Sequence, residues 1–188
     1  MRVFAYCAAS FADSTRRAAG VPPLTCPPVN AATFDPAWLA NRDLIYFDLH
    51  GEPGRPYWAG DQGQFALRIE QVRRASLGGA VVFAASCYLA DHDSPMLDAL
   101  LDAGARYVVG GDGRNWEGPR AAAMYGAGLL GQWFRRGMQA GLDPLRALGL
   151  AKRRLRLSLT LNRVIRSQAV ASAAKDTLAF RAYERKVA

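Results

Sequence analysis

The chain has 188 residues, of which 51% are apolar, and a formal net charge of +8 at pH 7. That length suits one α/β domain with a well-buried core and is too short for two ordinary domains. The positive charge is compatible with an acidic partner, with nucleic acid or with an ordinary charged surface, and it does not choose among them.

The three cysteines are Cys7, Cys26 and Cys87, and they form no CxxC motif. An odd number of cysteines at long, irregular spacings argues against a disulfide framework and favours a reducing compartment. His92 lies five residues after Cys87, but no further ligand pair accompanies them, so we expect no metal and no cofactor. The sequence contains no run of about 18 apolar residues and no secretory leader pattern, so we expect a cytoplasmic protein that does not enter the membrane.

The first part of the chain predicts two strands separated by a proline-rich stretch. Residues 2–9 and 43–49 are apolar enough for buried strands, and the prolines that follow the first strand prevent a long helix there. Asp35 and Pro36 predict a short helix, because they are a preferred N-cap and a preferred first helical residue. Residues 51–60 are rich in glycine and proline, which predicts a loop directly after the second strand.

The middle of the chain alternates helices with strands. Apolar spacing predicts helices over 64–75 and 94–103, and glycines separate each of them from a strand, at 80–86 and 106–109. Ser94-Pro95 begins the second helix as N-cap and first residue. This alternation predicts a parallel sheet with helices on both faces, the three-layer sandwich of an α/β protein.

The last part of the chain predicts helices over 119–138 and 143–157, followed by a basic helical tail over 160–188. We expect the tail to belong to a single domain that spans 1–188. The basic residues from Lys152 onward suggest an alternative, binding to phosphates, which a steep salt dependence would identify. A basic helix face is usually a solvated surface, so we do not expect nucleic acid as a partner.

Two of the predicted strands end in chemically reactive side chains. The strand over 43–49 runs into His50-Gly51, and the strand over 80–86 runs into Cys87. Ligands of an open parallel sheet bind beyond the carboxyl ends of its strands, so the imidazole and the thiol should meet at one edge. The pairing predicts a cysteine nucleophile with a histidine partner, and Gly51 adds a backbone N–H that no Cβ shields.

These residues resemble the caspase-like cysteine peptidases (clan CD), which include caspases, gingipains, clostripain, separase and bacterial CHAT domains. The shared pattern is an apolar strand ending in His-Gly, here Phe47 to Gly51, and a second one ending in a small residue and Cys, here Phe83 to Cys87. Met96 to Gly111 and Leu129 to Ala151 resemble the gingipain and CHAT branch most closely, so the resemblance covers about residues 40–160. It implies the caspase-hemoglobinase fold and an enzyme that cleaves peptide bonds.

The resemblance also implies roles for single residues. The backbone N–H groups of Gly51 and Cys87 would stabilise the oxyanion, and His50 would protonate the leaving amine. Trp58 and Trp116 match two tryptophans of the gingipain and CHAT branch, where the second lines the specificity pocket. Trp116 is therefore a candidate for substrate binding, although either tryptophan could simply pack within the protein.

The surroundings of the pair differ from those of caspases. The chain has Ala85-Ser86-Cys87-Tyr88-Leu89 in place of a Gln-Ala-Cys-Arg-Gly form, so aspartate specificity is not expected. Asp48, two residues before His50, is a candidate to orient the imidazole, and it could equally be a solvated residue at a strand end.

A substrate with a basic P1 side chain would require a carboxylate in the pocket. The predicted loops nearest the edge of the sheet contain Asp13, Asp91, Asp93 and Asp112. Relatives with arginine or lysine preference often place their acid after the first strand, as Asp13 is placed here. We name Asp13 and Asp91 as candidate substrate-binding residues.

The sequence therefore predicts a cysteine endopeptidase with a protein or peptide substrate, held inactive until a protein partner or a cleavage releases it. A rival interpretation is a catalytically silent caspase-like scaffold that binds partners. The intact His50, Gly51 and Cys87 argue against that rival.

Overall fold

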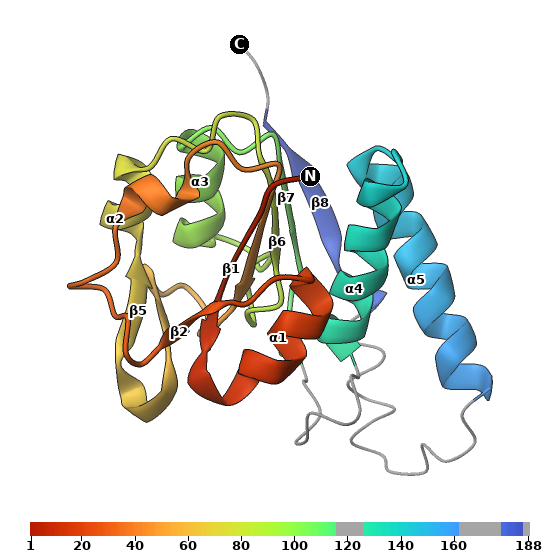
Figure 1. Cartoon of the computed structure of the whole chain (residues 1–188), viewed down its shortest axis with the longest axis horizontal. Coiled ribbons are helices and arrows are strands. Elements are labelled where there is room, and N and C mark those ends of the chain that lie inside the picture. Colours follow the sequence, from red (N-terminus) through yellow and green to blue (C-terminus); the bar gives the residue numbers. More distant parts are fainter. Residues whose placement is uncertain (116–125, 162–177, 186–188) are drawn as a thin grey trace.

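Figure 1 shows the computed structural model, in which residues 1–115, 126–161 and 178–185 are described. A six-stranded sheet forms the middle layer, with the strand order β2-β1-β3-β6-β7-β8. Neighbouring strands are parallel except at one edge, where β8 runs antiparallel to β7. The strands are β1 (Val3–Ala8), β2 (Leu24–Cys26), β3 (Leu44–Asp48), β6 (Val81–Ala84), β7 (Tyr107–Gly110) and β8 (Arg181–Glu184).

Helices cover both faces of this sheet (Figure 1). Two helices pack on one face and three on the other, each group around its own apolar core. The molecule is thus a three-layer α/β sandwich with a mostly parallel sheet, which confirms the predicted architecture. The helices are α2 (Ile69–Arg74) and α3 (Pro95–Asp102) on the first face, and α1 (Ala12–Ala19), α4 (Gly126–Gln139) and α5 (Pro144–Leu161) on the second.

β3 shows how one apolar run supplies both cores. Ile45 and Phe47 point into the core beneath α2 and α3, whereas Leu44 and Tyr46 point into the core beneath α1, α4 and α5. Side chains alternate between the two faces of a strand, so a strand covered on both faces needs apolar residues at every position. This requirement explains why β3 shows no alternation of apolar and polar residues in the sequence.

Two predicted helix starts, at Asp35 and at Ser94, are confirmed. Asp35 caps the short 3-10 helix Pro36–Leu39 by accepting a hydrogen bond from the N–H of Ala37 at 2.9 Å. Ser94 caps α3 in the same way, with Pro95 as the first helical residue. The predicted helix over 119–138 is described from Gly126 on, and its first residues lie outside the described part of the chain.

The prediction of a helix over 64–75 is wrong in its first half. Residues 65–68 form the strand β5 (Phe65–Arg68), which pairs antiparallel with β4 (Tyr57–Ala59) inside the predicted loop, and only α2 is helical. Phe65 is 41% exposed and its ring meets that of Tyr57 edge-on at 4.6 Å, whereas Ile69 is buried in the core. The apolar residues with helical spacing therefore belong to two surfaces rather than to one helix face.

The prediction of a helical tail over 160–188 is wrong at residues 181–184, which form the edge strand β8. Residues 160 and 161 belong to α5, and residues 162–177 and 186–188 lie outside the described residues. The hydroxyl of Tyr107 donates to Glu184 at 2.7 Å, and Arg181 forms an ion pair with Asp112 at 3.1 Å. These contacts join residues that are far apart in the sequence, so the local sequence does not predict them. Together with the pairing of β7 and β8, they stabilise residues 181–184 as a strand. No described helix is both long and apolar enough to cross a bilayer.

Two helical glycines give opposite predictions for stability. A Cβ on Gly131 of α4 would lie 2.6 to 2.9 Å from the rings of Tyr46 and Phe83, whereas a Cβ on Gly149 of α5 would meet nothing within 4 Å. We expect Gly131→Ala to lower the free energy of unfolding by about 1–3 kcal/mol through overpacking. Gly149→Ala should raise it by about 0.5–1 kcal/mol by restricting the unfolded chain. Urea denaturation of both variants tests this pair, and equal effects would contradict it.

Candidate active site

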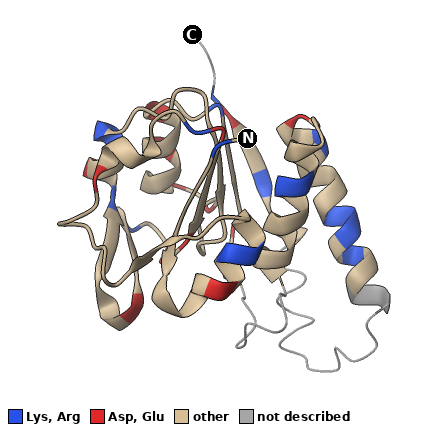
Figure 2. Cartoon of the chain, viewed as in Figure 1, with Lys and Arg blue, Asp and Glu red and all other residues tan. Residues whose placement is uncertain are grey.

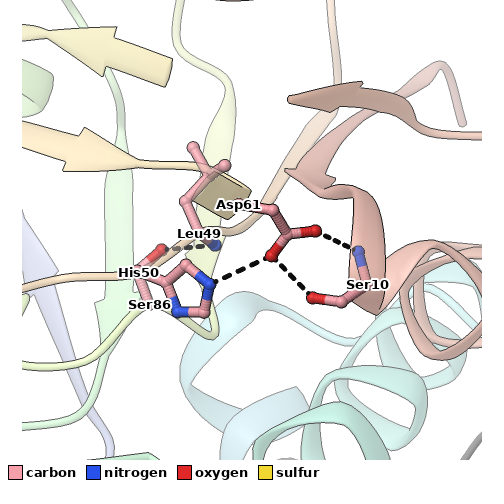
Figure 3. A network of polar contacts seen from close by, with 5 residues as sticks. All are labelled: Ser10, Leu49, His50, Asp61 and Ser86. Carbon is pink, nitrogen blue, oxygen red and sulfur yellow. Dashed lines mark hydrogen bonds and ion pairs between the residues drawn. The ribbon is translucent and has the colours of Figure 1, made fainter. Parts of the chain in front are cut away.

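The pairing of β3 with β6 ends just before the two predicted catalytic residues. Phe47 pairs with Ala84, an offset of 37 residues, and the same offset carried past the strand ends would place His50 opposite Cys87. Two hydrogen bonds join the segments beyond the last paired residues: the Ala85 N–H donates to the Phe47 carbonyl at 2.7 Å, and the Leu49 N–H donates to Ser86 Oγ at 3.1 Å (Figure 3). The contacts thus continue as far as Leu49 and Ser86, which directly precede His50 and Cys87.

Gly51 packs directly against the backbone of Cys87. A Cβ on Gly51 would overlap the carbonyl oxygen of Cys87 and would crowd its carbonyl carbon and amide nitrogen. Glycine is therefore required here by close approach of two main chains. The oxyanion role of the Gly51 and Cys87 N–H groups stays a prediction.

The thiol of Cys87 is bracketed by the backbone of Asn115. The Asn115 N–H donates to Cys87 Sγ at 3.2 Å, and the thiol donates to the Asn115 carbonyl at 3.4 Å. The side chain of Asn115, only 9% exposed, donates to the carbonyls of Ala85 and Ser86, both at 2.9 Å. Asn115 therefore attaches the described residues after β7 to the residues that precede Cys87, and it contacts the thiol. Cys87 as a whole remains partly exposed.

Burial of the thiol, together with the nearby Asp48 carboxylate, raises the pKa of Cys87 above its ordinary value. The N–H of Asn115 and the cation of Arg114 oppose this shift without overcoming it. A thiol with a raised pKa is protonated at neutral pH. The Cys87 side chain is therefore a thiol rather than a thiolate in this environment.

His50 is fixed through its backbone and half-exposed in its side chain. It exchanges two hydrogen bonds with Ala59 of β4, at 2.8 and 2.9 Å, and 48% of its side chain is exposed. Its Nε2 lies 3.4 Å from Asp61 Oδ1, and the ring of Phe11 meets the imidazole edge-on at 5.0 Å. The imidazole therefore stands at the rim, where a substrate can reach it.

Asp61 is held by Ser10, which lies between β1 and α1 (Figure 3). The Ser10 N–H donates to Oδ2 at 2.6 Å and the Ser10 hydroxyl donates to Oδ1 at 2.8 Å. Partial burial by itself would raise the pKa of Asp61, but the hydrogen bonds from Ser10 and the contact with His50 outweigh it and hold the pKa below its ordinary value. Asp61 is therefore ionised at neutral pH.

Asp48 is not the solvated strand-end residue considered as one possibility. It is 2% exposed, and Thr15 donates a hydrogen bond to its Oδ2 at 2.7 Å. A carboxylate that faces the imidazole is that of Asp61, and orientation of His50 by Asp48 stays a prediction. Asp48 acts on the site through its charge, because it raises the pKa of Cys87.

The remaining acids named from the sequence differ in exposure and in their partners. Asp13 is exposed in the first turn of α1, and Asp91 is half-exposed and accepts a hydrogen bond from the His92 N–H at 2.9 Å. Asp112 is paired with Arg181 in β8. Substrate binding by Asp13 and Asp91 stays a prediction, since neither contacts the residues of the site in a way that assigns it a role.

Of the two tryptophans named from the sequence, the structure describes Trp58 alone. Trp58 is buried in the core, with its ring 5.2 Å from that of Phe47, so it packs rather than binds. Trp116 lies outside the described residues, and its substrate-binding role stays a prediction. Cys7 and Cys26 are buried free thiols. Within the described ranges, no group of three His, Cys, Asp or Glu side chains could hold a metal ion.

Sequence reasoning missed three residues of the site: Ser10, Asp61 and Asn115. Asp61 lies in the stretch expected to be a loop and then a helix, so without the β4–β5 hairpin nothing connects it with His50. Asn115 directly precedes Trp116 in a loop that the sequence marks only as glycine-rich. No family model matches this chain, and a search of curated proteins finds no match either.

The raised pKa of Cys87 predicts how the thiol reacts with iodoacetamide. Only the thiolate reacts, so the alkylation rate should be low at pH 7 and rise about tenfold per pH unit until it passes the raised pKa. Peptide mass spectrometry separates Cys87 from the buried Cys7 and Cys26. A rate that is already constant above pH 7 would contradict this prediction.

Asn115→Ala should expose the thiol. The variant removes the two side-chain hydrogen bonds to Ala85 and Ser86, so the loop that brackets Sγ is held less firmly. We expect alkylation of Cys87 to become several times faster at a fixed pH. Asn30→Ala is the matched control, because the Asn30 side chain accepts from Ala32 within its own turn. Equal rates in the two variants would show that Asn115 does not restrict the thiol.

Proposed function

We propose that this chain is a cysteine peptidase of the caspase-like superfamily, closest to the CHAT and gingipain branch, that hydrolyses peptide bonds through Cys87 and His50. The observation that carries the proposal is the parallel pairing of β3 with β6, since His50 and Cys87 each follow the carboxyl end of one of these adjacent strands. That edge is where α/β proteins of this layout bind their ligands.

The three-layer sandwich supports assignment to the caspase-hemoglobinase fold. A mostly parallel sheet with helices on both faces is the architecture that the His-Gly and Cys strand motifs imply. Fold alone does not specify activity, so the proposal depends on the residues at the edge of the sheet rather than on the architecture.

The reaction divides between the two residues in the following way. Cys87 Sγ forms a bond to the carbonyl carbon of the scissile peptide, and the thiol proton passes to His50. The imidazolium then protonates the leaving amine as the C–N bond breaks, which leaves an acyl-enzyme and a neutral imidazole. Water, deprotonated by His50, attacks the acyl carbon, and the C–S bond breaks to restore the thiol and release the acid.

The backbone at Gly51 supports the oxyanion role. Its main chain lies against that of Cys87, so the two residues that would supply the oxyanion donors are close neighbours. Backbone donors fixed before the reaction stabilise the charge that develops on the carbonyl oxygen, and losing one such donor typically costs about 10²–10³ in rate.

The described state is a resting one. Sγ forms its hydrogen bonds with Asn115, and the pKa of Cys87 is raised, so the loop over 111–115 has to move before a peptide can reach the thiol. A bound substrate, a protein partner or a cleavage would supply that movement. A basic P1 side chain is the preference we propose, with Asp13 and Asp91 as the candidate acids.

A peptidyl chloromethylketone tests the proposal. An arginine- or lysine-based reagent should label Cys87 alone, and labelling should fall sharply in His50→Ala, because the imidazole assists loss of the thiol proton. The Cys87→Ala variant gives the background, and the adduct is located by peptide mass spectrometry. The Asn115→Ala variant is labelled in parallel, so that a covered thiol is not mistaken for an inert one.

Two results separate the proposal from its rival. Labelling of Cys87 that depends on His50, in the native chain or in Asn115→Ala, supports an activated nucleophile. Absence of labelling in both proteins, each shown to be folded by circular dichroism, would overturn the proposal and leave the catalytically silent scaffold as the better interpretation.

A further inference from the structure

A single carboxylate connects the imidazole of His50 to the start of α1. Asp61 Oδ2 accepts from the Ser10 N–H, and Oδ1 accepts from the Ser10 hydroxyl while it also faces His50 Nε2 (Figure 3). Ser10 and Asp61 lie 51 residues apart in the chain, and Asp61 and His50 lie 11 apart. The network thus depends on tertiary structure.

The backbone that carries Asp61 is tied to the backbone that carries His50. Ala59 exchanges two hydrogen bonds with His50, and Asp61 follows after only one intervening residue. That residue is Gly60, where a Cβ would overlap the side chain of Cys26, and its N–H donates to Gln64 at 2.8 Å. Close packing and the closed turn leave the carboxylate little freedom to move away from the imidazole.

A ring contact with Phe11 also restricts the orientation of the His50 imidazole. The ring of Phe11 meets it edge-on at 5.0 Å, and Phe11 directly follows Ser10 in the 3-10 helix Ala9–Phe11. The same short segment therefore holds the carboxylate through Ser10 and touches the imidazole through Phe11. His50 is constrained on its carboxylate side and on its ring edge, although half of its side chain is open to solvent.

The charge of Asp61 decides which nitrogen of His50 carries the proton. An ionised carboxylate only accepts hydrogen bonds, so the nitrogen that faces it, Nε2, has to be the N–H of the neutral imidazole. Nδ1 is then the atom with a free lone pair. It can accept the proton of Cys87 and, as the imidazolium N–H, deliver it to a leaving amine.

The separation of 3.4 Å is long for a hydrogen bond to a neutral imidazole. Catalytic hydrogen bonds are often long in a resting enzyme and shorten when charge develops, because a charge-assisted bond to a carboxylate is shorter and stronger. Asp61 is therefore placed to stabilise the imidazolium that forms during the reaction more than the imidazole that precedes it.

We propose that Asp61, held by Ser10, is the positioning residue of His50: it fixes the Nε2–H tautomer and leaves Nδ1 to transfer the proton. The assignment rests on the proposed peptidase function for its purpose, but the tautomer and the contact are properties of the folded chain whether or not it cleaves peptides. Asp61 does not touch the substrate and acts only through the imidazole.

Asp61→Asn tests the assignment by nitrogen NMR of ¹⁵N-histidine-labelled protein. The chain has only two histidines, so the spectrum is simple. We expect the neutral His50 to be the Nε2–H tautomer in the native protein, and to shift toward the Nδ1–H tautomer in the variant, because the new amide N–H can donate to Nε2. Peptidase assays of the same variant should show kcat reduced by about 10²-fold with KM unchanged.

His92 provides the internal reference. Its Nδ1 lies 2.7 Å from Asp93 Oδ2, and both side chains are exposed. In His92 it is therefore Nδ1 that faces a carboxylate, whereas in His50 it is Nε2. Asp93→Asn is the matched control: the same chemical change should alter the signals of His92 alone. Ser10→Ala keeps the carboxylate but removes one of its donors, so it should give a partial shift of the His50 tautomer. Asp61→Glu should restore the native tautomer at least in part.

The outcomes are distinct. An unchanged His50 tautomer in folded Asp61→Asn overturns the proposal, whatever happens to activity, and so does a kcat that does not fall in an active enzyme. If Asp61→Asn does not fold, the Ser10→Ala spectrum decides in the same way. A shifted tautomer in a chain that cleaves no peptide and labels no probe upholds the positioning role while the peptidase function fails.

Discussion

The parallel pairing of β3 with β6 is the constraint on which the candidate site depends. Register in a sheet with two buried faces is set by apolar side chains, and a shift of one residue would turn every side chain of a strand to the opposite face. The core beneath α1, α4 and α5 holds Tyr46 and Phe83, whose rings stack at 5.3 Å across this pair of strands. The same register, continued past the strand ends, would give His50 and Cys87 equivalent positions. Apolar packing of β3 against β6 therefore fixes where the chain enters each half of the candidate site.

The two halves of the site differ in their electrostatic surroundings. His50 stands at the rim beside the ionised Asp61. The Cys87 thiol is partly buried near the Asp48 carboxylate, and both features disfavour a negative charge on sulfur. Under the proposed peptidase function, the proton would therefore leave sulfur as the C–S bond forms, and the negative charge would pass to the carbonyl oxygen near Gly51.

The sequence was sufficient to predict features that depend on residues close together in the chain, as two examples show. The strand that ends at His50 and the cap at Ser94 follow from apolar runs and from local hydrogen bonding, and both are confirmed. The sequence was insufficient where distant segments decide: β8 exists because it pairs with β7, and Asp61 joins the site because a hairpin and Ser10 meet there. The sequence did not predict the β4–β5 hairpin, because Phe65 and Ile69 have the spacing of a helix face. In the structure Phe65 is exposed and Ile69 lies in the core.

The His50 imidazole and the Cys87 thiol are therefore held by two different segments of the chain. His50 is held by a hairpin whose turn is packed against β2 and tied to Ser10, so its orientation is a fixed property of the fold. The thiol is governed by the loop after β7, which contributes no apolar anchor at Asn115 but only hydrogen bonds to backbone atoms. Hydrogen bonds of this kind contribute about 1 kcal/mol each. Under the proposed peptidase function, a bound peptide would replace them with its own amide groups and uncover Cys87 without disturbing His50, so that the imidazole would already be in place when the thiol becomes free.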